Sequence, residues 1–405
     1  MNRILTLLLN IGEQMLLSGA EVSRAEESID KMGYAFGATR VDTFIITSSL
    51  VVTLHNAQGE TFTQTRRVRQ IGTDIERLHR LNKLSRDICN EHLSCDVAEA
   101  RFNDIKNTAS YPFAFHMLSY GVISAAFALF FGGRVIDSVC SFFIGLILSL
   151  VGALTEKRKL NAIFARFISA FVSTLLAFVF VRLGVLSSAD FAIIGNIMLL
   201  IPGIGITVAL RDMFVGDSLS GIIRTIEALL LAFSIAIGYF FSAFLMHNAT
   251  DATLVASPDP ILQIITGCIG SVGFAVLFNV RGKRLLFAAL GGLLSWALFL
   301  LLGAFISDEI IRYLIVSAFV SVYAEVMARL LKTPKTTFII TSLIPLIPGG
   351  SLYYTMRAAF SGDFLSLADK GADTLGYAGA LAAGVIVVAA IMKLLKLDGK
   401  RNKRP

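Results

Sequence analysis

Long apolar segments separated by short polar stretches occupy the chain from Tyr111 onward. Each is close to the roughly 20 residues that a helix needs to cross the hydrocarbon core of a bilayer. The segments cover 113–131, 135–154, 162–184, 190–210, 221–246, 261–279, 284–304, 310–330, 336–356 and 372–395. The pattern therefore predicts an all-α polytopic membrane region with about ten transmembrane helices.

The first 108 residues follow a different pattern and contain no apolar segment of that length. Apolar positions recur at helical spacing over about 2–17 and again over 71–106. Between these stretches, alternating and β-branched runs flank the turn Asn56–Gly59, which is typical of paired strands. We therefore expect a small α+β domain, residues 1–108, ahead of the membrane region.

One signature occurs twice in the membrane region. Ile-Pro-Gly, seven residues, Arg, two residues, Phe, one residue and Gly-Asp starts at Ile201 and again, 146 residues later, at Ile347. A shorter match, Ser-Ala-Phe-Val-Ser, starts at Ser169 and at Ser317. Each half holds five apolar segments, an odd number, so the second half must enter the membrane the other way up. We expect two inverted five-helix repeats, residues 109–250 and 258–399, an architecture common in transporters.

Composition and charge agree with a membrane protein. Hydrophobic residues make up 55% of the 405 residues and charged residues 16%, against about a quarter in soluble domains. The net charge of +7 comes from Lys and Arg that gather in alternate loops and in the C-terminal tail, which favours cytoplasmic termini over nucleic-acid binding. A preference for anionic substrates is the other explanation of this charge. The first helix is amphipathic, unlike a secretory signal.

The repeated signature interrupts two apolar segments with proline and glycine. These residues free backbone N–H and C=O groups inside the bilayer, where they are tolerated when they line a cavity or contact a substrate. A plain packing kink is the alternative. The candidate substrate-binding or gate residues at the two breaks are Asn196, Pro202, Gly203, Gly205, Thr207, Arg211, Ser342, Pro348, Gly349, Gly350, Ser351, Tyr353 and Arg357.

The two arginines of the signature allow two interpretations. Arg211 and Arg357 could each hold a substrate carboxylate through two hydrogen bonds. Each also lies six residues before an aspartate, Asp217 or Asp363, with which it could fix a loop at the membrane surface.

Three acids are candidates for proton coupling, because ionisable groups inside a membrane are costly and usually functional. Glu325 is flanked by aliphatic residues, and burial could raise its pKa toward neutrality. A structural pair with Arg329, one helical turn on, is the alternative. Glu227 and Asp373 stand 146 residues apart at equivalent repeat positions.

Other chemistry has little support in the sequence. Cys89, His92 and Cys95 stand three residues apart, but a fourth ligand is not evident, so we expect no metal. The chain shows no nucleotide-binding glycine loop and no nucleophile motif, so we expect no cofactor and no catalytic residue. A membrane-tethered hydrolase and a passive channel are the competing functions from other classes.

The chain resembles the threonine/serine exporter family in its fused form. The resemblance rests on Gly19-Ala-Glu21-Val-Ser-Arg24-Ala-Glu26, on Tyr34 to Gly37, on the strands from Val41 to Leu54 and on the Ile-Pro-Gly breaks. Residues up to about 250 resemble the larger component of two-component members, and those from about 258 resemble the smaller one.

That resemblance implies a multi-pass protein of the bacterial inner membrane that exports small hydroxy amino acids, driven by the proton gradient. Some split members are associated with succinate export, so a dicarboxylate exporter is the alternative. The resemblance also gives importance to Glu21, Arg24 and Glu26. The expected partners are a small-molecule substrate and membrane lipid, without nucleic acid, and a homo-oligomer is compatible with the sequence.

Overall fold

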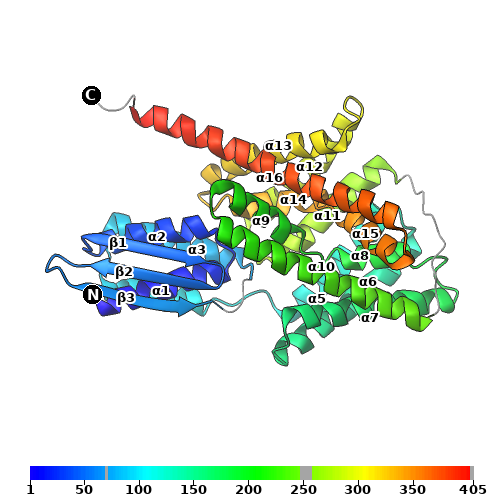
Figure 1. The fold of residues 1–405 in the computed structure, drawn as a ribbon, viewed down its shortest axis with the longest axis horizontal. Helices are drawn as coiled ribbons and strands as arrows, with labels where there is room; N and C mark the ends of the chain where they lie inside the picture. Colours follow the sequence, from blue (N-terminus) through cyan, green and yellow to red (C-terminus); the bar gives the residue numbers. More distant parts are fainter. Residues whose placement is uncertain (69–71, 247–257, 402–405) are drawn as a thin grey trace.

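The computed structural model describes residues 1–68, 72–246 and 258–401. Most of the expected joint between the halves, His247 to Pro260, lies outside these residues. Figure 1 shows a small domain of helices and strands at one end of a larger body of helices.

The N-terminal domain is α+β, as predicted. Three strands form an antiparallel sheet in the order β1-β2-β3. Helix α1 packs against β2 and β3, and α2 packs against β1. The alternation along β2 sends Leu50, Val52 and Leu54 into the core, while Phe44 of β1 is exposed on the open face. The elements are α1 (Asn2–Leu17), α2 (Val22–Ala35), β1 (Arg40–Ile46), β2 (Ser49–His55), β3 (Thr61–Arg67), α3 (Ile75–Glu91) and α4 (Cys95–Lys106).

The rest of the described chain is helical. The first half holds α5 (Phe113–Phe130), α6 (Val135–Lys157), α7 (Ala162–Arg182), α8 (Asp190–Ile197), α9 (Gly203–Val215) and α10 (Ser218–Met246). The second half holds α11 (Pro260–Leu277), α12 (Lys283–Gly303), α13 (Glu309–Leu331), α14 (Thr336–Leu343), the 3₁₀ turn η1 (Ile344–Leu346), α15 (Gly349–Ser361) and α16 (Phe364–Arg401).

Fewer helices than expected could span a bilayer alone. In the described part of the chain, eight are long and apolar enough, and α14–η1 with α15 makes a ninth if this pair, bent by 50°, counts as one span. The predicted segment 190–210 is instead two short helices, α8 and α9. Pro202 stands directly before α9 and cannot donate a backbone hydrogen bond into the preceding turn, so the segment is split there.

The two halves repeat the same series of helices. Helices α5 and α11 each have 18 residues, α8 and α14 each have 8, and α9 and α15 each have 13. Both 13-residue helices follow a proline and end at a glycine in the left-handed conformation, Gly216 or Gly362. The inversion of the second half remains a prediction.

Small residues let the long helices of each half approach closely. A Cβ on Gly238 of α10 would lie 2.6 Å from the Phe167 carbonyl oxygen of α7, and one on Gly384 of α16 would lie 2.6 Å from the Leu314 carbonyl oxygen of α13. Ser242 also donates a hydrogen bond to the Phe171 carbonyl across the first pair, at 2.7 Å. Such packing holds membrane helices together where the hydrophobic effect cannot.

The N-terminal domain docks on the loop between α11 and α12. The Ile75 backbone N–H donates to the Phe278 carbonyl at 2.9 Å, and the Asn279 amide donates to Asp74 at 2.9 Å. Arg284 pairs with Glu76 at 2.6 Å. Figure 1 shows the C-terminal end of α16 extending toward the same end of the molecule as this domain.

Burial and charge at this docking site change two pKa values. Burial of Glu76 acts to raise its pKa, but the guanidinium groups of Arg80 and Arg284 outweigh that effect and lower it. Burial, with the charge of Arg284, lowers the pKa of His79 to about 4. His79 is therefore neutral at physiological pH.

Candidate functional site: two helix breaks and a polar cavity

The two Pro/Gly breaks lie against each other in the membrane region. A Cβ on Gly349 would lie 2.1 Å from the sulfur of Met198 and 3.2 Å from Cδ1 of Ile201. A side chain at position 349 would therefore have to displace the Met198 and Ile201 side chains of the first break. Residues from the two halves thus meet where both helices are interrupted.

A buried carboxylate joins the two halves beside the breaks. Asp190, the first residue of α8, is 2% exposed. It accepts hydrogen bonds from the hydroxyl groups of Tyr353 at 2.6 Å and Ser188 at 2.8 Å, and Arg357 lies 3.4 Å away. We call Asp190, Tyr353 and Arg357 the Asp190 cluster. Because α15 supplies two of its members, the cluster fixes the second half to the first.

Arg357 has a partner that neither of its two interpretations named. The arginine pairs with Asp190, whereas Asp363 accepts hydrogen bonds from Ser366. The described partner of Arg357 is therefore a carboxylate of the other half, and both the substrate-carboxylate role and the loop pair with Asp363 remain predictions. The side chain of Arg211 lies outside the described residues.

A polar cavity of about 230 Å³ opens beside the second break. Of the residues predicted from sequence, Pro348, Gly350, Ser351 and Asp373 line it. The other lining residues come from α5, α12, α13, η1, α15 and α16, and they are Phe130, Phe131, Trp296, Glu309, Tyr313, Pro345, Ile347, Tyr354, Lys370 and Tyr377. The break therefore faces charged and hydroxyl groups as well as aromatic rings.

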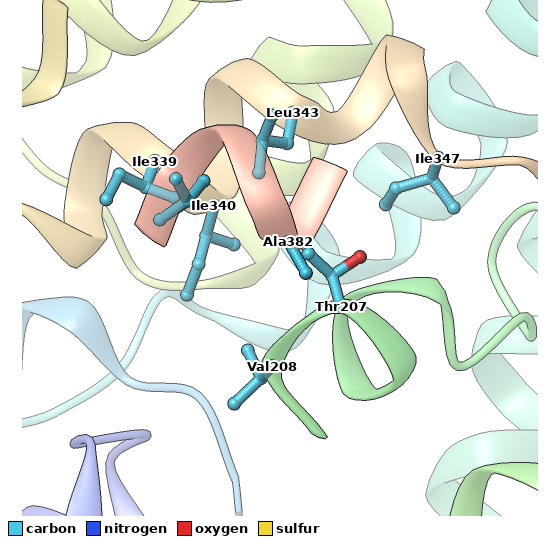
Figure 2. A pocket seen from close by; sticks show the side chains of 8 residues that line it. Thr207, Val208, Ile339, Ile340, Leu343, Ile347 and Ala382 are labelled. Atoms are coloured by element: carbon cyan, nitrogen blue, oxygen red, sulfur yellow. The ribbon is translucent and has the colours of Figure 1, made fainter. Parts of the chain in front are cut away.

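A second cavity, small and apolar at about 30 Å³, lies between α9, α14 and α16. Figure 2 shows Thr207 and Val208 of α9 on one side and the α14 side chains on the other, with Ala382 of α16 next to Thr207. The remaining lining residues are Ile339, Ile340, Leu343, Ile347 and Val385. Ile347 lines both cavities and so stands on the boundary between them.

The other residues predicted at the breaks do not line either cavity. Asn196 is buried in α8, where its amide donates to the Ala192 carbonyl at 2.8 Å. Ser342 is buried in α14. Pro202 precedes α9, and Gly205 lies near its ring.

The three acids predicted for proton coupling lie in different surroundings. Asp373 lines the polar cavity and lies 3.2 Å from Lys370. Glu325 lies near the C-terminal end of α13 and pairs with Arg329 at 2.8 Å. Glu227 is exposed on α10, among apolar residues that are also exposed, such as Ile226 and Leu230.

The motif residues of the N-terminal domain hold its elements together. Glu26 of α2 accepts the Ile45 backbone N–H of β1 at 2.9 Å, and burial raises the pKa of this carboxyl. Arg24 donates to Asn82 of α3 at 3.3 Å, and Glu21 stands at the N-terminal end of α2.

Two protein-family models match the sequence of this chain. A family model described as "Putative threonine/serine exporter" matches residues 6–246, and one described as "Threonine/Serine exporter, ThrE" matches residues 263–391. The chain belongs to the threonine/serine exporter family. This is a family of membrane transporters, and the tethered-hydrolase alternative is therefore wrong.

The sequence of this chain is similar to those of three known proteins. It is 22% identical to a "Threonine/serine exporter" of Corynebacterium glutamicum, over 98% of this chain and 84% of the relative. It is 23% identical to a "Probable threonine/serine exporter" of Mycobacterium tuberculosis, over 89% of this chain and 70% of the relative. It is 29% identical to a "Probable succinate transporter subunit" of Klebsiella aerogenes, over 55% of this chain and 86% of the relative. No solved structure matches this chain.

Proposed function

We propose that this chain is a secondary active exporter of threonine or serine, driven by the proton gradient. The observation that carries the proposal is the polar cavity beside a broken helix, in a chain of the threonine/serine exporter family. Broken helices are the usual place for substrate binding in secondary transporters, because they present free backbone groups at membrane depth.

The proposed mechanism is alternating access between two inverted repeats, with both termini in the cytoplasm. Helix α16 begins away from the N-terminal domain and runs toward it (Figure 1). The first turns of α16 supply Lys370 and Asp373 to the polar cavity, so we assign that cavity to the end away from the domain. The cavity then opens to the outside, and the apolar side chains around Thr207 close the cytoplasmic half. Export requires the cytoplasmic half to open while the outer half closes.

Proton coupling in this proposal falls to acids at the two ends of the pathway. Asp373 lies in the outer cavity, and Glu325 lies toward the end of α13 that precedes the basic loop at Lys332 and Lys335. Neither Glu325 nor Glu227 lines either cavity, so a role for either acid would require a contact that forms in another state.

Efflux from loaded vesicles tests the proposed function. We expect vesicles that contain the protein to release threonine and serine faster when the outside is made acidic than without a pH gradient. They should release succinate no faster than succinate-loaded vesicles without protein do. Release of succinate alone would favour the dicarboxylate alternative. A rate of threonine release that is the same with and without the pH gradient would favour a passive channel.

A further inference from the structure

Charged side chains of opposite sign face one another in the polar cavity. Lys370 and Asp373 lie one helical turn apart on α16, with Lys370 Nζ 3.2 Å from the Asp373 carboxylate. Glu309, the first residue of α13, also lines the cavity, accepts a hydrogen bond from Tyr377 at 2.5 Å and pairs with Arg312 at 3.2 Å. Among the described lining residues, one is therefore a cation and two are carboxylates.

This set of charges suits a ligand that carries both signs. An α-amino acid presents one carboxylate and one ammonium group a few ångströms apart, whereas succinate presents two carboxylates. A second carboxylate would meet Asp373 or Glu309, and like charges in a partly desolvated site repel. We propose that the cavity binds its substrate as a zwitterion, with Lys370 on the carboxylate and with Asp373 and Glu309 on the ammonium group. This assignment rests on the proposed function.

The uncharged part of the cavity fits a small hydroxylated side chain. Ser351 and Tyr354 supply hydroxyl groups, and Thr374 holds Ser351 in place with a hydrogen bond of 3.0 Å. Trp296 also lines the cavity and is buried. The aromatic rings of Phe130 and Phe131 provide an apolar wall against which a methyl group can pack.

Binding of threonine and of analogues that lack one charged group tests the assignment on the purified full-length chain. The probes are threonine, 3-hydroxybutyrate, which lacks the amine, threoninol, which lacks the carboxylate, and succinate. We expect Asp373→Asn and Lys370→Gln each to weaken threonine binding about tenfold or more, the usual loss for a hydrogen bond to a charged group. Asp373→Asn should leave 3-hydroxybutyrate binding unchanged, and Lys370→Gln should leave threoninol binding unchanged.

Matched controls come from the same helix. Asp369 and Lys393 are exposed on α16 and line neither cavity, so Asp369→Asn and Lys393→Gln should bind threonine as the parent does. The assignment is overturned if the parent exports threonine while the Asp373 and Lys370 variants bind it as the controls do. It is also overturned if the parent binds succinate more tightly than threonine. A parent that moves no amino acid at all in the vesicle assay refutes the proposed function itself.

Discussion

Replacement of Asp190 by alanine is expected to lower the free energy of unfolding by about 3–5 kcal/mol, the usual cost of breaking a buried ion pair. The carboxylate is 2% exposed and accepts from Tyr353 at 2.6 Å, with Arg357 3.4 Å away. Its loss leaves the Tyr353 hydroxyl, itself buried, without that acceptor. Because the cluster joins α8 to α15, export should fall with stability. Unfolding of the purified protein in detergent, followed by tryptophan fluorescence, measures the change.

Tyr353→Phe is the matched control for this prediction. It removes one hydrogen bond to Asp190 and keeps the ring and the arginine pair, so its expected cost is about 1 kcal/mol. If Asp190→Ala is no less stable than Tyr353→Phe, the ion pair contributes nothing to the contact between the halves.

Gly384→Ala is expected to disrupt the packing of α13 against α16. The added Cβ would lie 2.6 Å from the Leu314 carbonyl oxygen and 2.8 Å from the Ala318 backbone nitrogen. Backbone atoms cannot rotate away, so the helices must separate, at a cost of about 1–3 kcal/mol or more. We expect a lower yield of folded protein and a lower melting temperature, both measured by size-exclusion chromatography of heated samples.

Gly379 offers a control on the same helix. A Cβ at Gly379 meets nothing within 4 Å, so Gly379→Ala should be neutral or slightly stabilising, because alanine favours the helix. Gly238 holds the position 146 residues before Gly384, and Gly238→Ala should be as damaging as Gly384→Ala if the two halves pack alike. Equal melting temperatures for Gly384→Ala and Gly379→Ala would contradict the close packing of α13 and α16.

Local chemistry explains what could be predicted from the sequence. Proline before Gly203 and Gly349 fixes the start of α9 and α15, because proline ends the preceding helix and suits the first turn of the next. The alternation in β2 likewise predicted a strand with one buried face. The prediction of one spanning helix over 190–210 was wrong, because it rested on the length of the apolar segment. Pro202 divides that segment into helices too short to span alone.

Tertiary partners explain what could not be predicted. Asp190 stands at the start of an apolar segment. Its partners Tyr353 and Arg357 lie 163 and 167 residues further along the chain. A lone aspartate in that position is typical of a helix start, where it favours the positive end of the helix. Lys370 and Glu309 similarly come from two helices, and only their packing places them in one cavity.

The most direct test of the central claim, that substrate passes through the polar cavity, is cysteine labelling at Ser351. Ser351→Cys would be made in protein whose four native cysteines are replaced, with Ser307→Cys, in an exposed stretch before α13, as the control. An impermeant thiol reagent applied from outside should modify both, and threonine should slow the reaction at position 351 only. A labelling rate at position 351 that threonine leaves unchanged would contradict the account.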